Sequence, residues 1–235
     1  MKWMKRLLSV AFLLSFLTGC MFPQEELAKN QAPNEEQVAA VQSAVERFKS
    51  DNGGILPIKT KDAETPIYQK YLIDFQKLVP KYLSEVPGNS YESGGVFQYV
   101  LVDVETEPAV KIFDLRIAEE IREIKLRIGM QDYPPFKEQL SGSVFSLDFK
   151  KMGYESDPFA YSPYSGENLP FVITGEGELY VDYRTDIYRL VEEGVEMKPG
   201  TDVRESLVEH SIFVPAYSLP YTLDSDSGDP IFLEK

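Results

Sequence analysis

Hydrophobic residues recur with a helical period soon after residue 34, and this pattern predicts the first helix of the fold. Asn34 can cap the helix, because an asparagine side chain accepts hydrogen bonds from the free amides of a first turn. The apolar side chains of one face are Val38, Val41, Val45 and Phe48. The sequence Asp51-Asn52-Gly53-Gly54 predicts the end of the helix, because glycine readily adopts the left-handed conformation of a C-terminal cap.

A second, clearer helical pattern covers about residues 115–128. Asp114 can cap it, and Gly129 can close it. A single ridge of isoleucines runs along the helix at Ile117, Ile121, Ile124 and Ile128. Between the two helices, residues 65–87 mix aromatic side chains with helix formers, and Pro80 interrupts them. We expect one or two short helical turns there.

Alternating and continuous apolar runs predict the strands. Residues 96–105 predict a strand that is buried on both faces in its middle, and residues 109–113 predict its partner. Later strands are expected at 143–149, at 169–174 with a hairpin into 178–183, and on both sides of a polar turn near the C-terminus. Two short helices are expected at 185–193 and at 202–210, the second capped by Thr201.

A weak internal repeat relates residues 162–173 to residues 219–234. Both segments read proline-tyrosine, a polar turn with glycine, then proline and apolar strand residues. Two similar β-turn-β corners would account for this likeness without any ligand.

These elements together predict an α+β fold: an N-terminal helix, antiparallel sheets, an amphipathic helix at about 115–128 and a β-rich C-terminal half. Residues 20–34 are polar, contain two prolines and lack an apolar period, so we interpret them as a flexible tether. The globular region is then 35–235, and it divides into possible subdomains at 35–128 and 129–235.

The first 19 residues have the composition of a secretory signal peptide. A basic head precedes about eleven mainly apolar residues, fewer than the roughly 20 that a membrane-spanning helix needs. The following sequence, Leu17-Thr18-Gly19-Cys20, resembles the bacterial lipobox. That resemblance implies removal of residues 1–19, a diacylglycerol on the sulfur of Cys20, and attachment to the extracytoplasmic side of the cell membrane. The alternative roles as a disulfide or metal ligand lack a second cysteine in the sequence.

Charge excludes one class of partner. Without Lys2, Lys5 and Arg6 the chain keeps 21 basic residues against 38 acidic ones, a net charge of −17. A nucleic-acid partner is therefore not expected, because phosphate backbones bind positive surfaces. A general clamp of basic residues on anionic lipid is not expected either.

Few residues point to a specific chemistry. The carboxylates of Asp224, Asp226 and Asp229 alternate near a glycine, as Ca²⁺ loops do, but a solvated hairpin turn explains them as well because the EF-hand spacing is absent. Calcium is the one cofactor that the sequence leaves open. The single histidine, His210, is interpreted as a favourable charge near the end of a short helix.

Tyrosines and prolines cluster in three segments of the C-terminal half and could form a groove for an extended peptide or a glycan. The aromatic members of this hypothesis are Tyr133, Tyr161, Tyr164, Tyr217 and Tyr221. Loops held in place by buried proline and aromatic side chains are the alternative.

Two family resemblances follow from longer segments. Residues of about 38–104, from "AVERFKSDNGGILPI" to "FQYVLVD", resemble the globular part of pilins and pseudopilins, although a lipobox and a polar tether stand where those families have their hydrophobic assembly helix. The segments "TPIYQKYLIDFQKL", "YPPFKEQL" and "GDPIFLEK" resemble the YphF-like lipoproteins of bacilli. The second resemblance implies a location and no activity.

The sequence therefore predicts a lipid-anchored extracytoplasmic protein, without catalytic residues, that binds or scaffolds another envelope protein or an extracytoplasmic ligand. A solute-binding lipoprotein of a transporter is the alternative, and a cell-envelope enzyme comes third.

Overall fold

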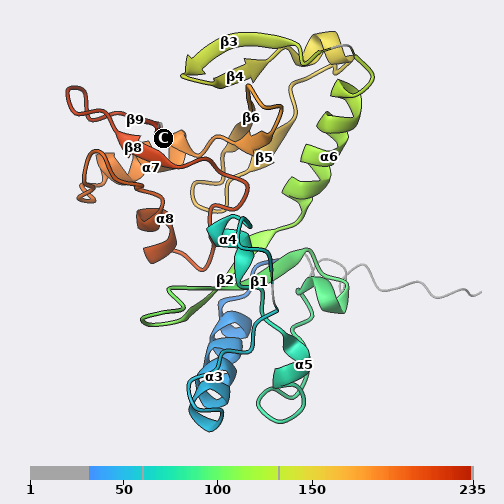
Figure 1. Cartoon of the computed structure of the whole chain (residues 1–235), viewed down its shortest axis with the longest axis vertical. Coiled ribbons are helices and arrows are strands. Elements are labelled where there is room, and N and C mark those ends of the chain that lie inside the picture. Colours follow the sequence, from blue (N-terminus) through green and yellow to red (C-terminus); the bar gives the residue numbers. More distant parts are fainter. Residues whose placement is uncertain (1–31, 60, 132, 234–235) are drawn as a thin grey trace, which may run out of the picture.

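The computed structural model describes residues 32–59, 61–131 and 133–233. This part of the chain has the predicted α+β fold, with helices and three antiparallel sheets (Figure 1). None of its helices is both long and apolar enough to cross a membrane. The predicted signal peptide, Cys20 and the tether up to residue 31 lie outside the described residues.

The first helix, α3 (Glu35–Asp51), begins and ends where the pattern predicts. The side chain of Asn34 accepts a hydrogen bond from the backbone N–H of Gln37 at 2.9 Å. Val38, Val41 and Val45 of the predicted apolar face are buried and Phe48 is half-buried, and the left-handed Gly53 and Gly54 follow the helix. The two short turns expected in the next segment are α4 (Ile67–Lys70) and α5 (Phe75–Leu78).

The central strand of the first half is buried on both faces, as predicted. Strand β1 (Phe97–Val102) pairs antiparallel with β2 (Ala109–Asp114), and every residue of β1 is buried. Phe97, Tyr99 and Leu101 belong to the core that includes α3. The alternate residues Val100 and Val102 instead pack with side chains near the C-terminus: Val208, Val214 and Ala216. The second face of β1 is thus covered by residues about one hundred positions later.

The chain returns to its first sheet through residues 212–214. The backbone N–H of Ile112 donates to the carbonyl oxygen of Ile212 at 2.9 Å. In the other direction, the backbone N–H of Val214 donates to the carbonyl oxygen of Ile112 at 3.0 Å. The ammonium group of Lys111 donates to the backbone oxygens of Val208 and Ser211. These bonds fix the late segment against the edge of β2.

Helix α6 (Arg116–Ile128) carries the predicted isoleucine ridge, and this ridge packs in the second core. Ile117, Ile121 and Ile124 are buried together with residues after 129, and Ile128 packs against them. The sequence grouped this helix with residues 35–128, whereas its apolar face lies among the C-terminal strands. Whether the two halves are separate subdomains stays a prediction.

The C-terminal half is β-rich, as predicted. Its main sheet has the strand order β3-β4-β6-β5, and β7 also pairs with β6. The bounds of these strands are β3 (Phe136–Ser141), β4 (Val144–Leu147), β5 (Phe159–Tyr161), β6 (Asn168–Thr174) and β7 (Leu179–Val181). The remaining elements are α7 (Arg184–Glu192), α8 (Glu205–Glu209), β8 (Tyr221–Leu223), β9 (Pro230–Phe232) and the 3₁₀ turns η1 (Tyr91–Ser93) and η2 (Phe149–Met152).

The predicted cap of α8 is wrong. The hydroxyl of Thr201 donates to the backbone oxygen of Lys198 and does not contact the helix start. The cap position is held by Arg204, whose side chain makes no cap bond, and the carboxylate of Asp202 accepts the backbone N–H of this arginine at 3.1 Å.

The internal repeat corresponds to two hairpin loops with the same hydrogen bonds. In loop 162–167 the hydroxyl of Ser162 accepts the backbone N–H groups of residues 164 and 165. In loop 224–229 the carboxylate of Asp224 accepts the backbone N–H groups of residues 226 and 227. Both loops continue with a left-handed glycine at their fifth position, Gly166 or Gly228. The expected pair of β-turn-β corners is confirmed.

Candidate functional site

Three helices begin with the same arginine–aspartate clamp. An aspartate stands two positions before an arginine in Asp-Leu-Arg, Asp-Tyr-Arg and Asp-Val-Arg, at residues 114–116, 182–184 and 202–204. In each clamp the aspartate accepts the arginine backbone N–H and two or more bonds from its guanidinium group. A bidentate pair of this kind fixes the geometry of the arginine side chain. The cap residues themselves make no side-chain cap bond, so the clamps lie at the starts of α6, α7 and α8 without capping them.

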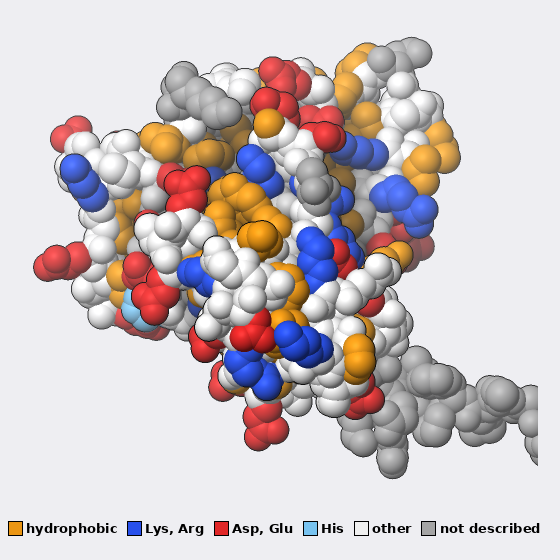
Figure 2. Space-filling model, turned by 60° about the horizontal axis from the view of Figure 1, so that its bottom comes forward, with side chains coloured by type: hydrophobic (Ala, Val, Ile, Leu, Met, Phe, Trp, Pro, Cys, Tyr) orange, Lys and Arg blue, Asp and Glu red, His pale blue; other side chains and the backbone are white. Residues whose placement is uncertain are grey.

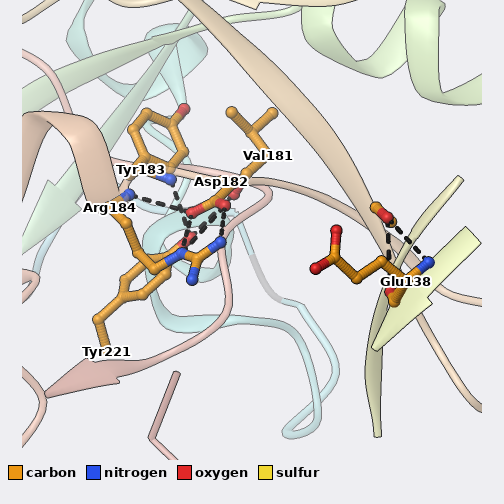
Figure 3. Close-up of polar contacts among 7 residues, drawn as sticks. Glu138, Val181, Asp182, Tyr183, Arg184 and Tyr221 are labelled. Carbon is orange, nitrogen blue, oxygen red and sulfur yellow. Dashed lines mark hydrogen bonds and ion pairs between the residues drawn. The ribbon is translucent and has the colours of Figure 1, made fainter. Parts of the chain in front are cut away.

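The clamp at α7 is joined to the last hairpin through one tyrosine hydroxyl (Figure 3). Arg184 holds Asp182 with a closest contact of 2.6 Å. The hydroxyl of Tyr221 accepts the backbone N–H of Tyr183 and donates to the backbone oxygen of Val181, both at 3.0 Å. Because Tyr221 is fully buried, these bonds are shielded from water. They hold the start of α7 rigidly against β8.

The clamp at α8 is buried more deeply. Arg204 is only 8% exposed, and its guanidinium group also donates to the backbone oxygen and the hydroxyl of Ser218. Arg204 lies over the ring of Tyr68, in the first half of the chain. The position of α8 is thus set by contacts with both halves.

A cleft opens where α7, α8 and loop 162–167 meet. Its volume is about 270 Å³. Its lining is mainly polar, and the side chains that carry charge or hydrogen-bonding groups are Tyr164, Ser165, Asp186, Arg189, Glu193, His210 and Ser211. This cleft contains the only histidine of the chain and one deeply buried carboxylate, so we take it as the candidate site.

Asp186 is the unusual residue of the cleft. Its side chain is buried, with 2% of the residue exposed, and it accepts hydrogen bonds from the hydroxyls of Ser162 and Ser165 at 2.5–2.9 Å. Within the described residues no cationic side chain forms an ion pair with it. Burial raises the pKa of the Asp186 carboxyl, and the two hydroxyls and the more distant Arg189 offset only part of this effect.

Tyr164 lines the same cleft with an unsatisfied polar group. Its hydroxyl is shielded from solvent and forms no hydrogen bond within the described part of the chain. Burial raises the pKa of this hydroxyl well above its ordinary value, and the nearby charge of Asp186 adds to the shift. A buried hydroxyl without a partner costs free energy that a bound ligand can recover.

The outer part of the cleft carries both signs of charge. Arg189 is about half exposed and lies 3.4 Å from a carboxylate oxygen of Glu167. His210 ends α8, as the sequence predicted, and its Nδ1 contacts the backbone oxygen of Ser206 at 2.9 Å. That nitrogen therefore faces a backbone group of its own helix.

The five tyrosines of the predicted groove lie in different places. Tyr164 lines the candidate cleft, Tyr161 lines an apolar hollow beside it, and Tyr133 lies with Met130 and Phe136 at the far end of α6. Tyr217 is half-buried, and Tyr221 is fully buried. Tyr221 therefore lines no open groove, because its hydroxyl is used to hold α7. Ligand contacts of the other four stay a prediction.

The three aspartates of the speculative calcium loop are described, and Asp224 has a structural role. Its carboxylate accepts two backbone N–H groups of its own loop, and these bonds lower the pKa of its carboxyl. No group of three potential ligand residues in the described ranges could hold a metal ion. Calcium binding by Asp224, Asp226 and Asp229 stays a prediction.

A second hollow, of about 420 Å³, lies on the other side of α8 and is lined by α4 and the turn between β1 and β2. Its carboxylates, such as Asp103 and Glu205, are exposed to solvent. Figure 2 shows both acidic and basic side chains spread over the face in view, around a hydrophobic group near its centre. Exposed carboxylates are stable without a ligand, so this hollow is the weaker candidate.

Sequence reasoning missed Asp186, Ser162, Ser165 and Arg189. An aspartate in the first turn of a helix is ordinary, because it complements the helix dipole. The one related signal is the spacing to the loop glycine, because Ser162 and Ser165 stand four and one positions before Gly166, as Asp224 and Ser227 stand before Gly228. Burial of Asp186 depends on loop 162–167 folding over α7, which no local pattern reveals.

Comparison with known proteins bears on the first half of the chain. Residues 34–114 match the family model of the YphF family N-terminal domain. The match starts at the cap of α3 and ends with the last residue of β2, and it stops short of α7, α8 and the cleft. No curated protein and no solved structure matches the chain. The local likeness to pilins therefore remains a sequence-based expectation.

The raised pKa of Asp186 predicts a pH-dependent stability. The folded protein binds a proton at this carboxyl more strongly than the unfolded chain, so this contribution to stability is present at low pH and is lost as the pH rises through the raised pKa. Asp186→Asn, which keeps an acceptor for the serine hydroxyls, should unfold at higher denaturant concentration than the wild type at pH 7. The difference between the unfolding midpoints of the variant and the wild type should shrink as the pH is lowered below the ordinary carboxyl range.

Urea titrations monitored by circular dichroism at several pH values measure this effect. The exposed Asp226 provides the matched control, and Asp226→Asn should change the unfolding midpoint little at any pH. A wild type that is more stable than Asp186→Asn at pH 7 would contradict the prediction.

Proposed function

We propose that this chain is a non-enzymatic binding module, attached by lipid on Cys20 to the outer face of the cytoplasmic membrane, whose cleft binds a small ligand with an ammonium or guanidinium group. The location is inferred from the lipobox-like sequence alone. The ligand class is inferred from the cleft between α7, α8 and loop 162–167.

One observation carries the ligand class: Asp186 is a buried carboxylate that has no cationic partner among the described residues, and it lies at a cleft that a small molecule can enter. Removal of a carboxylate from water is unfavourable unless an opposite charge or several hydrogen bonds compensate it. Two serine hydroxyls supply part of the compensation. An ammonium or guanidinium group would supply the rest, and it could also offer a proton to the unpaired hydroxyl of Tyr164.

The size and the rim of the cleft restrict the ligand further. A volume of about 270 Å³ is close to the lower end of the range for small-molecule sites. Arg189 at the rim could hold an anionic end of the same molecule. Its side chain is half exposed, and its ion pair with the carboxylate of Glu167 is 3.4 Å long. We therefore favour a compact amine or guanidinium compound that also carries a carboxylate.

The cleft bears on the alternative functions. Small-ligand sites are usually concave with a few convergent polar groups, and the lining of this cleft favours a small ligand over a purely scaffolding role. A transporter-type solute-binding lipoprotein remains the second candidate, because such a protein would also bind a small ligand in a cleft. Its two lobes would be expected to contain parallel βαβ units, whereas the described strand pairs within each sheet are antiparallel.

Thermal-shift and calorimetric titrations test the ligand class. Lysine, arginine, ethylammonium and guanidinium should be compared with acetate and succinate as anionic probes. At least one cationic probe should raise the melting temperature and bind measurably. In Asp186→Asn its affinity should fall roughly tenfold to hundredfold, since hydrogen bonds to charged groups contribute about 1.5–3 kcal/mol.

Asp226→Asn serves as the matched control, because Asp226 is exposed on a hairpin remote in sequence from the cleft residues. It should bind the same probe as the wild type does. If no cationic probe binds, or if one binds equally well to Asp186→Asn, the cleft is not the site that we propose.

Replacement of Cys20 tests the anchor separately. Cys20→Ala removes the only sulfur that can carry a thioether-linked lipid at this position. The variant should appear in the soluble fraction or accumulate as a longer, unprocessed precursor, because two acyl chains are what make such an anchor stable. Fractionation of cells followed by intact-mass measurement gives the result. Unchanged membrane association with an unchanged mass would refute the anchor.

A further inference from the structure

Large apolar side chains are exposed together at the far end of α6. Met130 is 82% exposed, Tyr133 73% and Phe136 40%. These three line one hollow together with Pro134, Pro135 and Lys151, and we call this surface the tip. Figure 1 shows that α6 leads from the first sheet to this end of the molecule, where β3 and β4 also lie. An exposed cluster of this kind on a soluble domain is typical of an interaction surface.

The charge around the tip differs from that of the whole chain. Residues 130–151 carry three lysines and three acidic residues, so this stretch is neutral, whereas the full sequence has a net charge of −14. Lys137 and Lys150 are exposed, and within the described ranges neither forms an ion pair. Lys151 contacts Asp148 only at 3.5 Å on the surface. The tip is thus an apolar and aromatic surface bordered by two lysines without ion pairs to described residues, in a stretch that lacks the acidic excess of the whole chain.

We propose that the tip rests on the anionic surface of the membrane, with Met130, Tyr133 and Phe136 inserted at the level of the lipid headgroups. Tyrosine favours this level because its ring is apolar and its hydroxyl is polar. Lysine side chains can extend their ammonium groups to lipid phosphates while their stems stay among apolar groups. An acidic protein partner would attract the same lysines, but the bilayer is the partner that a lipid anchor places within reach.

The geometry of the anchor permits this contact. Pro33, at the start of the described chain, lines a hollow with Arg116 and Ile117 at the beginning of α6. The 13 residues of α6 span about 20 Å from there to the tip. The chain between Cys20 and Ala32 can span at most about 40 Å when extended. A lipid on Cys20 can therefore lie in the same bilayer surface that the tip touches.

This inference rests on the proposed lipid anchor. A fluorescence experiment tests the membrane contact of the tip separately from the anchor. The only tryptophan of the sequence, Trp3, lies in the predicted signal peptide, so the processed protein offers a background without tryptophan. Tyr133→Trp places a single reporter at the tip. Tyr91→Trp is the matched control, because Tyr91 is 63% exposed on η1, in the other half of the molecule.

Both lipidated, processed variants are reconstituted into vesicles that contain phosphatidylglycerol and phosphatidylcholine with brominated acyl chains. Vesicle flotation and intact mass first establish the anchor. Quenching of the Tyr133→Trp reporter should exceed that of Tyr91→Trp by about threefold or more, with a blue shift of its emission, because only the tip enters the apolar boundary. Addition of Lys137→Glu and Lys150→Glu should reduce the quenching at the tip.

Equal quenching of the two reporters on vesicles that carry the floated protein would overturn the proposal. Quenching at the tip that is the same without phosphatidylglycerol, and is unaffected by the two lysine replacements, would overturn its electrostatic part. Failure of the protein to float would instead refute the anchor and the proposed location.

Discussion

The pairing of residues 212–214 with the edge of β2 is the constraint on which the rest of the structure depends. Two backbone hydrogen bonds at Ile112 and the contacts of Lys111 bring the late part of the chain back to the first sheet. The same segment covers the second face of β1 with Val208, Val214 and Ala216. Without this return, a strand that is apolar on both faces would be left half exposed, which would cost much of the stability of a domain of this size.

The candidate site is a consequence of that return. Segment 212–214 fixes α8, the buried clamp of Arg204 orients it, and Tyr221 holds the start of α7. The cleft lies between the two helices, and loop 162–167 closes one side of it through its serines and Asp186. A buried carboxylate with a raised pKa lowers the stability of the folded state near neutral pH. Residues that cost stability in this way are often kept for function, and Asp186 fits that pattern.

The sequence was sufficient for the elements whose signals are local. The cap at Asn34, the isoleucine ridge of α6 and the apolar run of β1 predicted the helices and the buried strand, because a periodic pattern depends only on neighbouring residues. The pattern could not show which core the ridge joins, because both cores are apolar. Strand β3 was missed because its residues are mostly exposed and do not alternate.

The site was beyond sequence reasoning for a related reason. Asp186, Ser162 and Ser165 are brought together by folding of segments about twenty residues apart, and each is an unremarkable residue in its own segment. The three arginine–aspartate clamps form a repeated tripeptide in the sequence, but the tripeptide alone does not show that each clamp lies at a helix start. The long-range return of residues 212–214 has no sequence pattern of its own, since backbone groups form its hydrogen bonds.

The protonation of Asp186 is the most direct test of this account. Carbon-detected NMR of the side-chain carboxyl, titrated against pH in the free protein and with saturating arginine or guanidinium, reports its pKa in both states. We expect a pKa of the Asp186 carboxyl above the ordinary aspartate value in the free protein, and a lower pKa when a cation occupies the cleft. An ordinary pKa that the cation does not change would contradict the claim that this carboxylate awaits a positively charged ligand.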